Sequence, residues 1–171
     1  MLKHPVPVDL LAHIGDITVS FALLESEIQS FLGALIREHQ RVGQIIASQL
    51  SFARLRAATI SLYVDRHGRD EDYLKLKGLM NEAGKIEAER DQIAHSLWGA
   101  GASPGTITRI KLTAREKRGF QAQFEHYDGA KLAAFATKIR DVAERLQRLQ
   151  FELLERSKLF NSPGAKMWGS A

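Results

Sequence analysis

The sequence contains no cysteine among its 171 residues. This absence excludes disulfide bonds and zinc sites built from thiolates. Long apolar runs are also missing, because no stretch reaches the roughly 18 uncharged apolar residues that a membrane-spanning helix needs. The first residues carry Asp9, His13 and Asp16 where a signal peptide requires an uninterrupted apolar segment. We therefore expect a cytoplasmic protein that does not enter a membrane.

The common signatures of enzymes are missing as well. The sequence has no HExxH, no GxSxG and no lysine motif of the Walker type. Its six histidines are scattered, without the paired spacing of metal ligands on one helix face. The glycine-rich segment GAGASPG, at 99–105, follows a predicted helix and not a strand, so it lacks the context of a phosphate-binding loop. We expect neither a metal ion nor an organic cofactor.

What is present favours a single helical domain. The apolar content of 44% and the charged content of 26% are typical of soluble globular proteins. A chain of 171 residues suits one domain. We expect residues 1–160 to form it and residues 161–171 to be a flexible tail.

Apolar residues recur at alternating spacings of three and four in three long segments, which indicates helices. The first has Asp9 as its predicted N-cap and a stripe from Ile14 to Leu35; the others span about 70–98 and 129–159. A less regular segment, about 42–65, either forms one helix or restarts at Ser51 as two shorter pieces. These segments predict an all-α fold, an antiparallel four-helix bundle whose second helix is split in the latter case.

Between the last two helices the apolar period changes from 3.6 to 2. The segments TITRIKLT and GFQAQFEHY are rich in β-formers, and AREKR joins them as a charged turn. We expect a β-hairpin over about 106–127, inserted between helices three and four. Phe120, Ala122 and Phe124 alternate with polar residues and give the hairpin one apolar face. An isolated hairpin is marginal in water, so this face should pack on the bundle or on a second subunit.

The hairpin also holds the basic charge of the protein. Between Pro104 and Gly119 the surplus of basic over acidic residues is four, which equals the net charge of the whole chain, +4. Such a patch either contacts phosphate, as in RNA, or keeps a sheet edge soluble and unpaired. The candidate RNA-binding residues are Arg109, Lys111, Arg115, Lys117 and Arg118.

One residue breaks the apolar stripe of the third helix. Arg90 stands where the rest of the row is leucine, alanine and isoleucine. A buried guanidinium needs either a carboxylate partner, for which Glu25 and Glu87 are candidates, or a cleft that holds an anion. His95 follows five residues later, about 140° around an ideal helix, and shares a face with Asp91. Gly99 is expected to end the helix in the left-handed conformation.

The motif RDQIAH, Arg90 to His95, on the late third helix of a predicted four-helix bundle, resembles the HEPN superfamily. The longer segments ERDQIAHSLW and GDITVSFALLESEI are also similar to small bacterial proteins of this type. The resemblance implies a homodimer and a metal-independent endoribonuclease, often a toxin or defence effector that is paired with an antitoxin or another partner protein. It assigns catalysis to Arg90 and His95, with Asp91 as the polar residue beside the arginine.

Two alternatives remain open at this point. Other members of that superfamily have lost catalysis and bind nucleotides or partner proteins, and the frequent asparagine of the motif is Asp91 here, whose charge would repel phosphate. Alternatively, Arg90 packs its stem and His95 caps the helix, and both are structural. Trp98, one turn after His95, either stacks on a base or packs under the hairpin.

Overall fold

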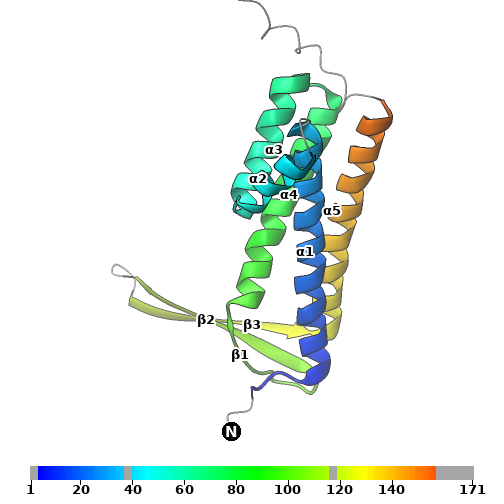
Figure 1. The fold of residues 1–171 in the computed structure, drawn as a ribbon. Coiled ribbons are helices and arrows are strands. Elements are labelled where there is room, and N and C mark those ends of the chain that lie inside the picture. Colours follow the sequence, from blue (N-terminus) through cyan, green and yellow to red (C-terminus); the bar gives the residue numbers. More distant parts are fainter. Residues whose placement is uncertain (1–3, 37–39, 116–118, 157–171) are drawn as a thin grey trace, which may run out of the picture. The chain divides into compact units, whose positions relative to one another are not determined.

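The structure is a computed structural model of the chain, and it describes residues 4–36, 40–115 and 119–156. The described residues are mostly helical, as the sequence predicts, and a small antiparallel sheet lies between the fourth and fifth helices in the chain (Figure 1). The elements are α1 (Val8–Ile36), α2 (Gln40–Ser48), α3 (Phe52–His67), α4 (Glu71–Ala94), β1 (Leu97–Ala100), β2 (Thr106–Arg115), β3 (Gly119–Asp128) and α5 (Gly129–Glu155). The predicted tail, 161–171, falls outside the described residues.

The chain forms two compact units. One consists of Met1–Phe21 and Ile86–Ile139, and the other of Ala22–Lys85 and Arg140–Ala171. The sheet therefore belongs to the first unit, whereas α2 and α3 belong to the second.

The apolar stripes of the long helices form the core. In α5, the stripe from Leu132 to Leu153 is buried throughout, and in α1 the stripe is buried from Ile17 to Leu35. The periodicity therefore identified the inward faces of both helices correctly.

By length and composition alone, α1 could cross a membrane, because the mean hydropathy over one 18-residue window of the helix is 1.4. The core helix of a soluble protein passes the same test, and 44% of this window is buried inside the structure. The expectation that the chain does not enter a membrane stays a prediction.

Polar side chains fix where the helices begin. Ser51 accepts a hydrogen bond from the backbone N–H of Arg54 at 3.4 Å and starts α3, so the predicted split of the second helix is confirmed. Asp128 accepts from the N–H of Lys131 at 2.7 Å and caps α5, also as predicted. Asp9 lies inside the first turn of α1, and the prediction that it precedes this helix was wrong by two residues.

The helix that the sequence predicts as the third of the bundle is α4 in the structure, and it ends earlier than predicted. α4 stops at Ala94, and residues 97–100, expected to be the last helical turn and its stop, form strand β1. Gly99 lies within this strand, and the glycines with positive φ among the described residues are Gly68 and Gly105. The predicted stop at Gly99 was therefore wrong, and the left-handed residue is Gly105 in the turn that follows β1.

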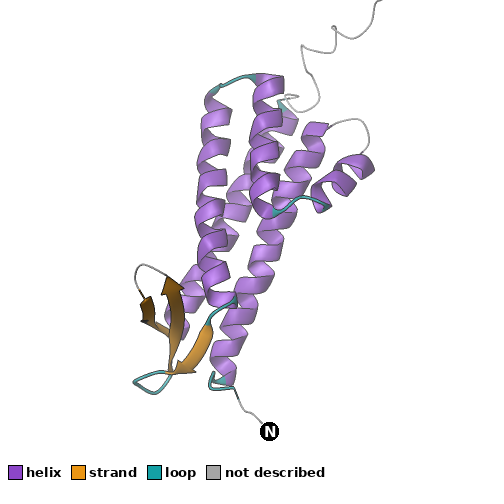
Figure 2. Ribbon diagram, turned by 90° about the vertical axis from the view of Figure 1, so that its left-hand side faces the viewer, coloured by secondary structure: helices purple, strands orange, loops and turns teal. Residues whose placement is uncertain are grey.

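The three strands form one antiparallel sheet in the order β1-β2-β3 (Figure 2). The predicted hairpin is confirmed as β2 and β3, and β1 pairs with β2 only from Ile107 to Ile110. Because side chains alternate between the two faces, Trp98, Ile107, Arg109, Glu125 and Tyr127 share one face.

That face is the inner face of the sheet, since Ile107, Arg109 and Tyr127 are buried. The apolar residues Phe120 and Phe124 lie on the opposite face and are exposed. Of the two alternatives predicted for this apolar face, packing on the bundle was therefore wrong, and packing on a second subunit stays a prediction.

Candidate active site

Arg90 lies on α4 with a side chain that is 25% exposed. Its guanidinium carbon lies 4.1 Å from the centroid of the Phe21 ring, which α1 supplies. Its Nη1 forms an ion pair with the carboxylate of Asp91 at 3.0 Å, whereas its Nε is buried with no hydrogen-bond partner among the described residues. The aromatic face and the carboxylate together explain how a cation occupies this row of the helix.

The ion pair between Arg90 and Asp91 joins neighbouring residues at the surface, and the Asp91 side chain is 50% exposed. Pairs of this kind contribute only about 0–1 kcal/mol, because water and salt screen them. An anion with better geometry, such as a phosphate that accepts two N–H groups, can therefore displace Asp91.

His95 is the first residue beyond α4, and its side chain is exposed. Its backbone N–H donates to the carbonyl of Asp91 at 3.0 Å, which completes the last regular turn. Among the described residues, no hydrogen bond joins His95 to Arg90. One copy of the chain therefore presents the two side chains near the same helix end, with no hydrogen bond between them in the part of the chain that the structure describes.

Two side chains keep α4 from continuing. Ser96 donates its hydroxyl to the carbonyl of Gln92, and the indole N–H of Trp98 donates to the carbonyl of Ile93 at 3.1 Å. These bonds satisfy carbonyls that a helix end leaves without partners. Trp98 is half-buried and meets the ring of Tyr127 edge to face at 5.3 Å. Trp98 therefore packs beside Tyr127 on the inner face of the hairpin, which is the structural alternative predicted for it.

The inner face of the sheet carries a second charged cluster. Arg109 Nη2 donates to Glu125 at 2.6 Å, and Lys131 donates to the other oxygen of Glu125 at 2.7 Å. Lys131 also lies 3.9 Å from the centroid of the Tyr127 ring. The hydrogen bond from Lys131, followed by that from Arg109, holds the pKa of Glu125 below its ordinary value despite partial burial. Burial and the charge of Glu125 raise the pKa of Tyr127 to about 12.

This cluster changes the predicted RNA surface. The Arg109 side chain is only 9% exposed, and its position on the inner face does not fit a contact with RNA. Lys111 is exposed on β2 and fits the predicted surface. The side chain of Arg115 and the residues Lys117 and Arg118 lie outside the part of the chain that the structure describes. Glu125 was missed as the partner of Arg109, because a five-residue turn AREKR would place Arg109 opposite Gln123, whereas the observed register places it opposite Glu125.

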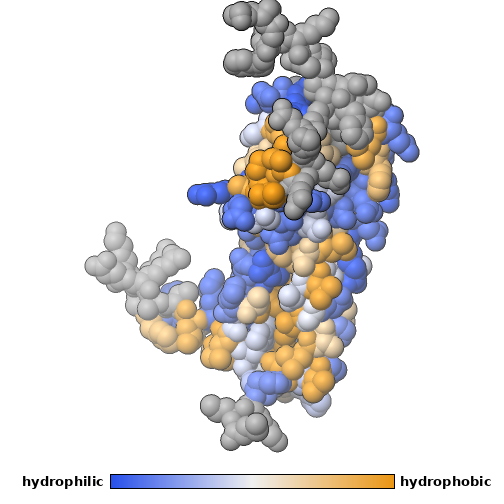
Figure 3. All heavy atoms as spheres, in the orientation of Figure 1, coloured by the Kyte–Doolittle hydropathy of each residue, from blue (hydrophilic) through white to orange (hydrophobic). Residues whose placement is uncertain are grey.

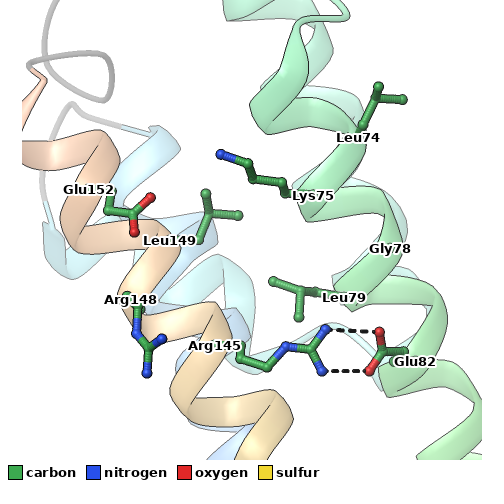
Figure 4. Close-up of a pocket in the computed structure, with 9 residues that line it drawn as sticks. All are labelled: Leu74, Lys75, Gly78, Leu79, Glu82, Arg145, Arg148, Leu149 and Glu152. Carbon is green, nitrogen blue, oxygen red and sulfur yellow. Dashed lines mark hydrogen bonds and ion pairs between the residues drawn. The ribbon is translucent and has the colours of Figure 1, made fainter.

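A separate groove of about 400 Å³ lies between α4 and α5 (Figure 4). Arg145 spans it and makes a two-pronged ion pair with Glu82, at 2.9 and 3.0 Å, while it also contacts Asp141. Because its central cation is already paired twice, we place the candidate site at Arg90 and His95 instead. Within the described ranges, no three histidine or acidic side chains gather as a metal site.

Comparisons of the chain with protein-family models, curated proteins and solved structures found no match.

Proposed function

We propose that this protein is a HEPN-like endoribonuclease that acts as a homodimer. One observation carries the proposal: the end of α4 presents both an arginine whose guanidinium is already held in position and a histidine that is exposed to solvent. Phe21 and Asp91 hold the Arg90 guanidinium in place, and His95 is open to solvent just beyond the last turn.

The chemistry needs no group beyond these side chains, since RNA supplies its own nucleophile. The 2′-oxygen attacks the neighbouring phosphorus while a histidine accepts the 2′-hydroxyl proton. The bond from phosphorus to the 5′-oxygen breaks, and that oxygen takes up a proton. The products are a 2′,3′-cyclic phosphate and a 5′-hydroxyl. Arg90 stabilises the negative charge on the non-bridging phosphate oxygens in the transition state through its N–H groups.

A dimer supplies the second proton carrier. One copy offers a single His95 at the site, and one histidine cannot both accept and donate a proton in the same step. Two copies placed about a two-fold axis would bring two arginines and two histidines to one cleft. His95 of one copy would then accept the proton that starts the reaction, and the partner's His95 would protonate the leaving 5′-oxygen.

Asp91 acts as a stand-in for phosphate until RNA binds. Its carboxylate occupies Nη1 of Arg90 at 3.0 Å and must leave when phosphate arrives. Asp91→Asn keeps the size of the side chain and removes its charge. We expect this variant to bind RNA more tightly and to cleave it faster at low substrate concentration.

The decisive test uses matched variants on a mixed-sequence RNA. His95→Ala and Arg90→Ala should each abolish cleavage, while the circular dichroism spectrum and the mass of the dimer in solution stay unchanged. His4→Ala and Arg54→Ala are the controls, because both residues are exposed and lie outside the site, and they should cleave as the wild type does. Cleavage at the wild-type rate by either variant would contradict the assignment of that residue as catalytic.

The basic residues of the hairpin other than Arg109 would hold the RNA backbone. Each phosphate contact that a lysine or arginine makes adds to the salt dependence of binding. Replacing Arg115, Lys117 and Arg118 by alanine should make the slope of log affinity against log salt shallower. An equal slope would show that these residues do not belong to the RNA-binding surface. Lys111→Ala tests separately the part of that surface that the structure describes.

A second candidate function is a catalytically silent protein of the same type that binds a partner protein or a nucleotide. The specific observation in its favour is that Asp91 already neutralises Arg90. In that case wild type and Asp91→Asn would both fail to cleave RNA, while an antitoxin or other partner protein would still bind.

We also infer that the second unit is an antiparallel four-helix bundle, with α2 and α3 sharing one position. Contacts within this unit support the arrangement. Arg145 joins α5 to Glu82 of α4, Gln150 joins α5 to Ser30 of α1 at 3.2 Å, and Arg56 of α3 donates to the carbonyl of Met80 in α4 at 2.9 Å.

A further inference from the structure

The outer face of the sheet is apolar and exposed. Register and alternation place Leu97, Ile110, Leu112, Phe120 and Phe124 together on it. Phe120 is 70% exposed and Phe124 is 64% exposed, and orange atoms reach the surface at the hairpin in Figure 3. Large apolar side chains gathered in this way mark a surface that another molecule covers.

The hairpin itself needs such a cover. β1 pairs with β2 only up to Ile110, so the outer part of the hairpin from residue 111 is a ribbon of two strands. Two strands alone are marginal in water, and an apolar face must pack on something to stabilise them. β3 has no lysine, arginine or proline to protect its free edge.

A hollow of about 450 Å³ opens on the same face. Its walls are the small residues 99–102 at the end of β1, together with Ile110, Phe124 and His126. The hollow exists because residues 99–102 are glycine and alanine, and larger side chains at these positions would fill the space. The hollow is large enough to take one aromatic ring.

We propose that this outer face docks on the same face of a second copy of the chain, with Phe120 of each copy in the hollow beside Phe124 of the other. An interface about a two-fold axis requires the projecting group and its receptor on one surface, and this face carries both. Phe120 and Phe124 are four residues apart on β3, about 13 Å, so a two-fold axis between them brings each ring to the opposite hollow.

The charges favour a second copy as the occupant. Among the described positions of the outer face, the titratable side chains are His126 and Asp128, and Asp128 stands at the end of β3, where it caps α5. Arg109, Lys111 and Glu125 lie on the inner face. Around Phe120 and Phe124, two copies can therefore approach face to face without repulsion between like charges.

The area is also sufficient for the centre of an interface. Aromatic side chains can bury about 150–250 Å² each, so Phe120 and Phe124, about two thirds exposed, offer roughly 200–330 Å². Leu97 and Leu112 lie beside them and are also more than half exposed. A stable interface buries about 800 Å² on each partner, and these side chains would supply its apolar centre. We take this contact to be the two-fold contact of the proposed homodimer, so that a single interface accounts for the dimer; the inference does not depend on RNA cleavage.

The test is the mass in solution, measured by sedimentation equilibrium across a range of concentrations. Wild type should have twice the chain mass of 19.1 kDa, and Phe120→Asp should be a monomer with unchanged circular dichroism. Phe151→Asp is the matched control, because Phe151 is 58% exposed on α5, and it should remain a dimer. A dimer that Phe120→Asp leaves intact overturns the proposal.

A second measurement locates the contact. The chain has no cysteine, so Phe120→Cys combined with Ala102→Cys introduces the sole thiols. Mild oxidation should give a disulfide between two chains, because Phe120 of one copy would lie near the partner's Ala102. Crosslinks only within one chain contradict this arrangement. A monomeric wild type also overturns it, and binding of neutral phospholipid vesicles by that monomer would assign the face to a lipid surface instead.

Discussion

The ion pair under the sheet should respond unequally to the loss of its two partners. Glu125→Gln removes the charge that faces Arg109, whose side chain is 9% exposed and whose Nε and Nη1 have no partner among the described residues. Stranding a buried charge costs about 3–5 kcal/mol. The glutamine oxygen can still accept one hydrogen bond, so we expect a loss of about 3 kcal/mol in the free energy of unfolding.

Arg109→Met is the milder change, although it breaks the same pair. The methionine fills the space of the arginine stem and removes the unpaired N–H groups. Glu125 keeps its bond to Lys131 and is 40% exposed, so its charge is not stranded. Replacing a buried ion by an apolar residue of similar size is often neutral, and we expect a change within about 1 kcal/mol.

Thermal unfolding at pH 7, followed by circular dichroism, measures this difference. For a chain of this size 1 kcal/mol shifts Tm by about 2–4 °C, so Glu125→Gln should lower Tm by about 6–12 °C and Arg109→Met by less than about 4 °C. The double variant should resemble Arg109→Met, because it leaves no charge stranded. A larger loss for Arg109→Met than for Glu125→Gln would refute the reasoning.

Three further predictions concern stability. The pKa of Glu125 is lowered from its ordinary 4.5, chiefly by Lys131, so its contribution is complete above pH 4.5 and is lost as pH falls through the lower folded value; the Tm gap between wild type and Glu125→Gln should close below pH 4.5. Trp98→Phe leaves the carbonyl of Ile93 without its donor and should cost about 1–3 kcal/mol in urea unfolding. Ser51→Ala removes the N-cap of α3 and should cost about 1 kcal/mol, a shift of about 2–4 °C in Tm.

The long helices could be predicted from the sequence because their signals are local and repeated. The stripe from Leu132 to Leu153 gives α5 its buried face, and Asp128 marks its start with a capping side chain. Ser51 marked the break between α2 and α3 for the same reason. Each of these features depends on residues within a few positions of each other.

The end of α4 could not be predicted because its causes are not periodic. β1 has four residues, too few to show alternation, and they continue the helical row with Leu97. The helix ends because Ser96 and Trp98 satisfy its last carbonyls and because β2 offers a partner strand. Alternation also showed that the hairpin has an apolar face, but it could not show that Arg109 lies on the inner face and Phe124 on the outer one.

The candidate site was predicted in part. Arg90 could be singled out because it breaks an apolar row, and burial then demands a partner. Phe21 lay on the predicted stripe of α1, but only the packing of α1 beside α4 within the first unit shows that its ring supports the guanidinium. The exposure of His95 follows from the early end of α4, which the sequence did not reveal.

The most direct test of the proposed function compares an RNA strand with its 2′-deoxy counterpart, each incubated with wild type and with His95→Ala in the presence of a metal chelator. We predict that wild type cleaves the RNA to 2′,3′-cyclic phosphate ends and leaves the deoxy strand intact, and that His95→Ala cleaves neither. Cleavage of the RNA by His95→Ala at the wild-type rate, or cleavage of the deoxy strand by wild type, would contradict the account.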